Sequence, residues 1–527
     1  MANKAPRALR TMDEPFHKLL DADTHANNIT AAMRIDCPIE PGPALVSKAR
    51  YISREYHELE KQYLWSQVWQ QAAHEDDFAN IGDVVPYDIV DKSYLLVRTG
   101  EDDYKAFHNA CLHRGRKLRE SPAKGLDEIR CAFHGWSWEL DGTLKQVPCA
   151  YDYSGLDREA ERLPEVKVGR WGRYLFINPD PDCEPLEDYL GDLSSQFKVF
   201  PYERRYKRAH VAKVIRANWK VVQEAFMESY HVLLTHPQGL TGGANDMCTK
   251  YDVFGNYSRA IRTGALDGSG VPDWEPLAGS NTALVRHPLS GWVYADAGDG
   301  HVRVTTPKGK SGLFTAKGKW LEGELKDANQ HLCILVGGRK VAGATMGQGN
   351  SRTMDPQQTE RLDKKLGEGV TPRVLAAEAI RDSLRKVIPS IADTIPDIEL
   401  TSAVYLTLFP NFHPWGSFNE INYRFRPNGD NHEECIMEVM MMAPIPDDGV
   451  YTPTREVRQL DIDDDFVEAE KELGALGPVF NQDTLNMPHV HQGMKASARS
   501  HIRLAEYNET KIRHFHKLYD KWVDANR

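Results

Sequence analysis

The spacing of hydrophobic positions separates the first part of the chain into a helical segment and a strand-rich segment. Residues 46–75 carry apolar side chains at helical spacing. From about Asp83, short runs of β-forming residues bounded by Gly, Asp and Pro predict a small all-β domain that closes at 173–180. Within it, Asp141-Gly142 predicts a tight hairpin turn of type I′, which needs positive φ.

A larger mixed region begins near Val211. Helical spacing predicts a helix over 218–235 and an amphipathic helix near 374–388. Alternating apolar and polar residues predict a sheet with one buried face, and long helices follow it. The expected strands cover 403–412, 418–427 and 434–445, and the expected helices cover 455–475 and 495–523. The interval from about 238 to 370 has the least readable pattern of the chain.

Composition narrows the class of protein. The chain has 527 residues, of which 41% are hydrophobic, so two or three domains with large cores are expected. The net charge of −11 argues against nucleic acid as a partner. No apolar run is long enough to span a membrane, and the N-terminus lacks the apolar core of a secretory signal. We therefore expect a cytoplasmic location, where eight sparse cysteines would not form a disulfide framework.

Two Cys-His pairs on glycine-flanked loops carry the strongest chemical signal. Cys111 and His113 lie in CLHRGRKL, and Cys131 and His134 lie in CAFHGWSWELDGTL. Two thiolates and two imidazoles form the ligand set of a Rieske [2Fe-2S] centre, with two cysteines on one iron and two histidines on the other. Each loop would then supply one ligand to each iron.

Structural zinc is the alternative interpretation, because two Cys and two His also form a tetrahedral zinc site. Zinc motifs usually open with a Cys-Cys pair and close with a His-His pair. Here each pair is Cys-His, which favours the iron–sulfur cluster. Colour separates the two cases, since a Rieske protein is red-brown and a zinc protein is colourless.

A second metal site is predicted around His231 and His236. On a straight helix, positions five apart point about 140° away from each other, so the two rings could not share a metal. His236 precedes Pro237, and a residue before proline is pushed out of the helical region. The helix is therefore expected to end near Thr235, which frees His236 to turn back. Asp483 is the one carboxylate in 480–497, and two His with one carboxylate leave open positions on Fe(II) for O2 and substrate.

These segments together resemble the large (α) subunit of Rieske non-haem iron aromatic ring-hydroxylating oxygenases. The resemblance covers the two cluster loops, Asn218-Trp219-Lys220, the Tyr230-His231 and His236 pair, and Asp483 in a Gln-Asp…Gln-Gly context. It implies a mononuclear iron held by His231, His236 and Asp483, in addition to one Rieske cluster per chain.

Glu228 marks a departure from the family pattern, which usually has Asp three residues before the first iron histidine. In the family this carboxylate bridges a cluster histidine of a neighbouring subunit and an iron histidine, and carries electrons between them. Glu is one methylene longer, so the bridge can form with altered geometry. The resemblance thus implies a bridge by Glu228 between His134 of a neighbour and His231 of its own chain.

The resemblance also implies a fold and a division into domains. The expected class is α+β: an all-β Rieske [2Fe-2S] domain plus a larger catalytic domain with an antiparallel sheet and helices (helix-grip, Bet v1-like or START-like). The expected limits are 1–58 for an N-terminal arm and helix, 59–185 for the Rieske domain, and 186–527 for the catalytic mononuclear iron domain. An insertion is expected within 240–370, because the chain is longer than is usual for the family.

The function implied is that of a terminal oxygenase component, which uses O2 to cis-dihydroxylate or monooxygenate an aromatic or polycyclic substrate. Glycine pairs in the chain lack a dinucleotide-binding motif, so electrons are expected from a ferredoxin and/or a flavin reductase. A homotrimer is implied, with or without a small β subunit. The rival interpretations are a Rieske electron-transfer or sensor protein without oxygenase activity, and a zinc-binding scaffold.

Overall fold

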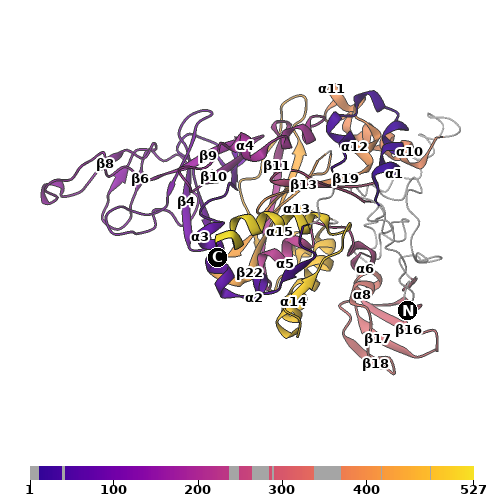
Figure 1. Ribbon diagram of the computed structural model, residues 1–527. Helices are drawn as coiled ribbons and strands as arrows, with labels where there is room; N and C mark the ends of the chain where they lie inside the picture. The colour runs from indigo at the N-terminus through magenta and orange to yellow at the C-terminus, as the bar shows by residue number, and fades with distance from the viewer. Residues whose placement is uncertain are drawn as a thin grey trace.

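The structure is a computed structural model of the chain, and it shows a narrow strand-rich domain projecting from a larger body of sheet and helices (Figure 1). It describes residues 11–37, 42–236, 249–263, 284–287, 290–337, 370–416, 418–474 and 476–526. The combination of antiparallel sheets with separate helices confirms the predicted α+β class.

The projecting domain is built on a six-stranded antiparallel sheet in the order β2-β10-β9-β5-β4-β3. A three-stranded sheet, β6-β7-β8, extends from it and carries the second Cys-His loop. The strands are β2 (Gln70–His74), β3 (Val84–Ile89), β4 (Lys92–Arg98), β5 (Tyr104–His108), β6 (Ile129–Arg130), β7 (Ser137–Trp138), β8 (Leu144–Gln146), β9 (Glu165–Trp171) and β10 (Tyr174–Asn178). The all-β domain predicted from the short β-forming runs is therefore present.

The helix predicted over 46–75 is shorter than expected. The segment forms α2 (Ala49–Ile52) and α3 (Arg54–Tyr63), and Ser53 caps α3 by accepting a hydrogen bond from the backbone of Glu55. Beyond it, β2 is fully buried and pairs with β10. Sheet pairing thus overrides the helical spacing of this sequence.

The hairpin at Asp141-Gly142 forms, but the predicted turn type is wrong. Only Gly142 has positive φ, at +86°, whereas a type I′ turn needs two such residues. The amide of Gly142 donates to the carbonyl of Glu139 at 3.0 Å. The connection is thus a longer loop that ends in a left-handed glycine.

The larger body contains an eight-stranded sheet in the order β12-β13-β19-β20-β21-β22-β11-β23. Its strands are β11 (Arg205–Ile215), β12 (Thr249–Val253), β13 (Tyr257–Arg262), β19 (Ala403–Leu408), β20 (Phe412–Pro414), β21 (Ile421–Asn428), β22 (Asn431–Pro444) and β23 (Arg458–Leu460). Helices α5 (Trp219–Glu224), α14 (Leu476–Ala496) and α15 (Thr510–Trp522) pack against this sheet. Asp483, one of the metal-site candidates, therefore lies on a helix that packs against this sheet.

Two C-terminal expectations are corrected. The helix predicted over 455–475 is mostly absent, since this segment holds β23 and the short α13 (Glu470–Leu473). The helix predicted over 495–523 is present only in part, because α14 ends at Ala496, strand β24 (His501–Arg503) follows, and α15 begins only at Thr510. The single helix predicted over 218–235 is also interrupted, with α5 followed by α6 (Val232–Thr235).

A compact subdomain lies in the interval that showed no clear sequence pattern. Strands β14 (Leu284–Arg286), β15 (Val293–Gly298), β16 (His301–Thr305), β17 (Ser311–Thr315) and β18 (Trp320–Gly323) form a five-stranded antiparallel sheet. Helix α8 (Gln330–Gly337) packs on it and lies beside α6 in Figure 1. The sheet and helix share a core of their own, which includes Tyr294, Phe314 and Cys333. Among the described residues, no helix is long and apolar enough to cross a membrane.

Candidate functional site

The two Cys-His loops have matching backbone geometry at the end of the Rieske-like domain. The amide of Cys111 donates to the carbonyl of Arg116 at 2.8 Å, and the amide of Cys131 donates to the carbonyl of Trp136 at 2.8 Å. Each hydrogen bond closes its loop into a turn, and the Cys-His pair lies within the closed segment. The two pairs predicted from the sequence as one ligand set are brought together by this geometry.

The four side chains of the pairs converge. Both cysteines are buried as free thiols, and each thiol lies within hydrogen-bonding reach of the other. The rings of His113 and His134 have centroids 4.5 Å apart. Nδ1 of His113 is buried and has no hydrogen-bond partner among the described residues, as a ring nitrogen reserved for a metal would be. The donor set and this free nitrogen fit a [2Fe-2S] cluster.

Two aromatic residues that the sequence reasoning missed support His113. Its ring stacks on Trp136, with centroids 5.3 Å apart and planes 6° apart. The hydroxyl of Tyr153 lies 3.3 Å from Nε2 of His113. Tyr153 lies outside both loop segments and 40 positions from His113, so only the fold reveals this contact. It can tune the electron donation of His113.

The second predicted metal site is assembled from α6 and α14. Helix α6 ends at Thr235, and His236 leaves it with φ −116° and ψ 67°, as expected for a residue before proline. Nε2 of His236 lies 2.7 Å from Oδ1 of Asp483, and Nε2 of His231 lies 3.3 Å from the same oxygen. One candidate ligand atom from each residue lies within 4.8 Å of the others. Two imidazoles and one carboxylate in this arrangement fit mononuclear iron.

The other ring nitrogen of each histidine is held by a neighbouring side chain. Nδ1 of His231 lies 2.6 Å from a carboxylate oxygen of Glu228, and Nδ1 of His236 lies 3.0 Å from Oε1 of Gln482. These contacts place a proton on each Nδ1 when Nε2 binds a metal, and they fix the ring orientation. Gln482 was not predicted as a site residue, although it directly precedes Asp483.

Charge is concentrated at this site. Burial alone would lower the pKa of His231, but the carboxylates of Glu228 and Asp483 outweigh it and raise that pKa to about 10. Burial alone would raise the pKa of Asp483, but the neighbouring His236 and His231 hold it far below its ordinary range. Without metal, the site is therefore an imidazolium–carboxylate cluster, and a metal ion must displace the proton from Nε2 of His231.

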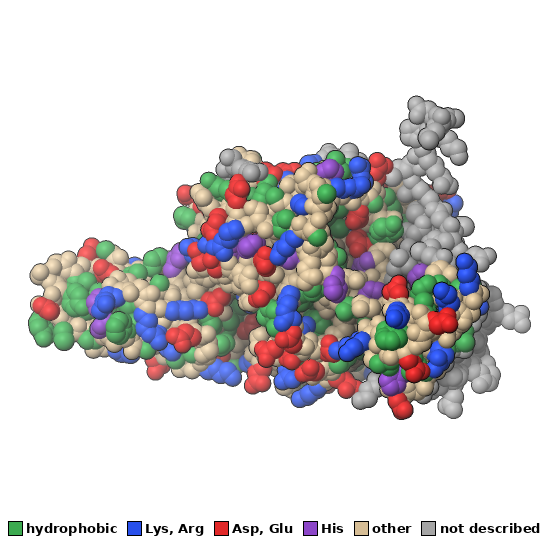
Figure 2. All heavy atoms as spheres, turned by 90° about the horizontal axis from the view of Figure 1, so that it is seen from below, with side chains coloured by type: hydrophobic (Ala, Val, Ile, Leu, Met, Phe, Trp, Pro, Cys, Tyr) green, Lys and Arg blue, Asp and Glu red, His purple; other side chains and the backbone are tan. Residues whose placement is uncertain are grey.

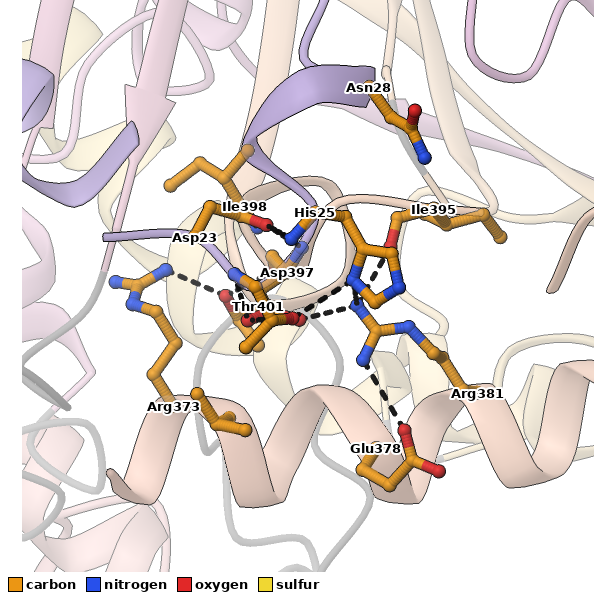
Figure 3. A network of polar contacts seen from close by, with 12 residues as sticks. Asp23, His25, Asn28, Arg373, Glu378, Arg381, Ile395, Asp397, Ile398 and Thr401 are labelled. Carbon is orange, nitrogen blue, oxygen red and sulfur yellow. Dashed lines mark hydrogen bonds and ion pairs between the residues drawn. The ribbon is translucent and has the colours of Figure 1, made fainter. Parts of the chain in front are cut away.

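A second His-carboxylate cluster contains Asp23, His25 and Asp397 (Figure 3). The carboxylate of Asp23 accepts hydrogen bonds from the backbone amides of Asp397 at 3.0 Å and Ile398 at 2.8 Å. The Arg381 guanidinium pairs with Asp397 and lies 3.0 Å from Nδ1 of His25. An arginine already supplies the positive charge here, so the cluster attaches the N-terminal arm to the catalytic body.

Two known families match the segments of the chain that carry the two candidate sites. The Rieske [2Fe-2S] domain family matches residues 68–158, and the ring hydroxylating alpha subunit (catalytic domain) family matches residues 200–282 and 342–525. The first range contains all four cluster-loop candidates, and the second contains His231, His236 and Asp483. The gap between the catalytic ranges contains the β14–β18 subdomain. The domain limits and the insertion expected within 240–370 stay predictions.

Curated relatives match the chain over part of its length. The carnitine monooxygenase oxygenase subunit of Escherichia coli (strain K12) is 30% identical over 189 residues, which is 36% of this chain and 50% of that protein. The large subunit of anthranilate 1,2-dioxygenase from Acinetobacter baylyi is 27% identical over 213 residues, 38% of this chain and 44% of that protein. The chain thus spans about half the length of the curated relatives it matches.

Solved structures match almost the whole fold. Naphthalene 1,2-dioxygenase from Rhodococcus sp., bound to indole, has a TM-score of 0.55 at 16% identity, covering 98% of this chain and 99% of that one. A quaternary ammonium Rieske monooxygenase has the same TM-score at 15% identity, covering 93% and 99%. At this identity the likeness concerns the fold. Together with the family matches it shows that the chain belongs to the ring-hydroxylating alpha subunits, with a Rieske [2Fe-2S] domain and a catalytic domain that binds mononuclear iron.

Proposed function

We propose that the chain is a terminal oxygenase component that uses O2 and electrons from a redox partner to hydroxylate an aromatic or polycyclic substrate. The observation that carries the proposal is the convergence of His231, His236 and Asp483 on a chain that also carries the two Cys-His loops. An electron-transfer or sensor protein would need the loops but not the second site. The catalytic-domain match also favours the oxygenase over that alternative.

In this proposal Cys111, His113, Cys131 and His134 hold the cluster, which accepts single electrons and passes them on. Histidine ligands raise the cluster potential above that of an all-cysteine cluster, which suits electron delivery by a ferredoxin and/or a flavin reductase. Trp136 and Tyr153 keep the ring of His113 in place.

His231, His236 and Asp483 would hold the iron, which supplies the O2 chemistry when it is bound. The chain contributes orientation: Gln482 and Glu228 hold the Nδ1 atoms so that both Nε2 atoms face Asp483. Burial of His236 and Asp483, which are 4% and 6% exposed, excludes bulk water from this side of the site. Such shielding limits wasteful release of reduced oxygen.

Electron transfer is proposed to run between chains. Strands β6 and β8 belong to the sheet that carries the second cluster loop, and they lie at one end of the molecule, far from α6 (Figure 1). Hydrophobic side chains gather at that free end (Figure 2), where Phe133 is 56% exposed and Tyr151 is 89% exposed. We infer that this end docks onto the catalytic domain of a neighbouring copy in a homotrimer, with or without a small β subunit.

Glu228 is the proposed bridge in that contact. Its carboxylate already contacts Nδ1 of His231 at 2.6 Å and accepts a hydrogen bond from the backbone amide of His231 at 3.0 Å. A histidine of the docked cluster, His134 of the neighbouring copy, would approach the same carboxylate. The added methylene of Glu relative to Asp lengthens the bridge without removing its charge.

A quaternary ammonium compound is the second candidate substrate class, because relatives act on carnitine and on glycine betaine. Aromatic walls suit both classes, since rings stack on planar hydrocarbons and also attract cations. Near Asp483 the rings of Tyr423 and Phe480 pack with centroids 5.9 Å apart.

The deciding experiment supplies 18O2 and a reducing partner to protein whose iron content has been measured. A panel of aromatic, polycyclic and quaternary ammonium compounds is then analysed by mass spectrometry. Labelled hydroxylated product from an aromatic compound supports the proposal, and labelled product from quaternary ammonium compounds alone reassigns the substrate class. No labelled product from iron-replete protein contradicts oxygenase function.

A further inference from the structure

The β14–β18 subdomain brings a histidine toward the metal site. Its helix α8 is fixed on the sheet at its N-terminus, where the backbone amide of Asn329 donates to the hydroxyl of Tyr294 at 2.8 Å. The side chain of Asn329 then accepts from the amide of Leu332 at 3.1 Å, as a helix cap does. Leu332 and Cys333 are buried in the subdomain core, and His331 precedes them on the helix. The position of His331 is therefore set by the packing and capping of α8 on this subdomain.

His331 reaches the two elements that carry the iron-ligand candidates. Its Nε2 lies 3.3 Å from Oδ1 of Asn486, which is one helical turn beyond Asp483 on α14. Nδ2 of Asn486 lies 3.4 Å from the hydroxyl of Thr235, the residue before His236. Asn486 thus links His331 to the end of α6 and to α14.

Only Nε2 of His331 is engaged by these contacts. With the Asn486 amide oriented so that its nitrogen faces Thr235 and its carbonyl oxygen faces His331, Nε2 carries the proton and donates. A neutral imidazole protonated on Nε2 has a bare Nδ1 that can only accept a hydrogen bond. Burial lowers the pKa of His331, which agrees with a neutral ring. The charges of Asp483, His236 and His231 also influence this pKa, so the ring lies close to these three residues.

Nδ1 of His331 is buried, and no described residue donates to it. A buried acceptor left without a donor costs about 1–3 kcal/mol, so such groups are normally satisfied by a protein group, an ordered water or a bound ligand. Beside a metal site that must admit a substrate, the natural donor is a group on that substrate.

We propose that His331 is a specificity-determining residue whose Nδ1 accepts a hydrogen bond from a hydroxyl group of the substrate. The inference rests on the proposed oxygenase function, and it extends that function to hydroxyl-bearing members of the substrate class. The β14–β18 subdomain then contributes the side chain of His331 to the substrate site.

The test uses pairs of compounds that differ by one hydroxyl group. The aromatic pair is naphthalene and 2-naphthol, and the quaternary ammonium pair is γ-butyrobetaine and L-carnitine. Binding to anaerobic protein that carries both metal centres is measured by calorimetry for the wild type and for His331→Phe, which keeps a ring but removes the acceptor. His331→Gln retains an acceptor oxygen, and His301→Phe, on β16 of the same subdomain, is the matched control.

Whichever pair of compounds binds, the wild type and His301→Phe should bind its hydroxylated member about tenfold more tightly than the other member. This ratio is the contribution of one hydrogen bond of about 1.4 kcal/mol. His331→Phe should bind both members equally, and His331→Gln should recover part of the preference. Equal binding by the wild type, or an unchanged preference in His331→Phe, overturns the inference while leaving the oxygenase function standing. Binding of neither pair to iron-replete protein counts against the proposed function, and the inference falls with it.

Discussion

The hydrogen bond between His236 and Gln482 allows a quantitative test of the iron site. Gln482→Met keeps the length of the side chain but removes the oxygen that lies 3.0 Å from Nδ1 of His236. Without metal, His236 can move its proton to Nε2, which lies 2.7 Å from Asp483. With metal on Nε2, the proton must stay on Nδ1 and would have no acceptor. The substitution therefore penalises the metal-bound state selectively.

A buried donor without a partner costs about 1–3 kcal/mol, and His236 and Gln482 are both buried. That cost corresponds to a loss of ferrous affinity of about 5- to 150-fold, which includes the range of about 10- to 100-fold typical of residues that orient metal ligands. The assay is equilibrium dialysis against buffered Fe(II), with iron counted relative to sulfide so that the cluster is separated from the mononuclear site. Gln492→Met, at an exposed position of the same helix, is the control. A ferrous affinity within about twofold of wild type in folded Gln482→Met protein would refute this reasoning.

Three further predictions address electron transfer, the cluster and the fold. Glu228→Gln removes the charge of the proposed bridge and should slow reoxidation of the reduced cluster, followed by stopped-flow absorbance, by about tenfold or more. Glu228→Asp should largely preserve the rate. Equal rates in the wild type and both variants would count against the bridge. Tyr153→Phe removes the hydroxyl that lies 3.3 Å from Nε2 of His113 and so weakens electron donation by that ring. The reduction potential of the cluster should rise by about 40 mV in a redox titration. An unchanged potential would contradict a role for this contact. Glu438→Gln leaves Arg424, whose guanidinium lies 2.7 Å from the Glu438 carboxylate, under-compensated in the core and should lower the free energy of unfolding in urea by about 3–5 kcal/mol. Because the folded-state pKa of Glu438 lies well below its ordinary value of 4.5, the stabilisation by this carboxylate is present above pH 4.5 and fades as the pH falls below it. The difference in the free energy of unfolding between the wild type and Glu438→Gln should therefore shrink on acidification. A difference that grows would contradict a charged Glu438 in the core.

The candidate metal ligands that the structure brings together could be proposed from the sequence, because their chemistry is local in sequence. The Cys-His spacing specifies the cluster loops, and Pro237 explains why the helix ends before His236. Asp483 was identified as the only carboxylate in its segment, although the helix that carries it was not predicted. α14 contains Pro488 and only weakly periodic apolar positions, so its helical state depends on packing against α5 and β11.

The supporting residues could not be predicted, because each depends on contacts between distant parts of the chain. Gln482 approaches His236 across 246 positions, and Asn486 approaches His331 across 155. The β14–β18 subdomain has short strands, and its small core contains residues such as Tyr294 that single-sequence patterns do not single out. The same limit applies to β2, where pairing with β10 decided between strand and helix.

The presence of a Rieske cluster together with a mononuclear iron in one chain is tested by counting iron and sulfide per chain and recording EPR of the dithionite-reduced protein, for the wild type and Asp483→Ala. We expect about three irons and about two sulfides in the wild type, with a rhombic Rieske signal. Asp483→Ala should lose about one iron and keep the sulfides and the signal. Zinc in place of iron with no cluster signal, or an iron content unaffected by Asp483→Ala, would contradict this expectation.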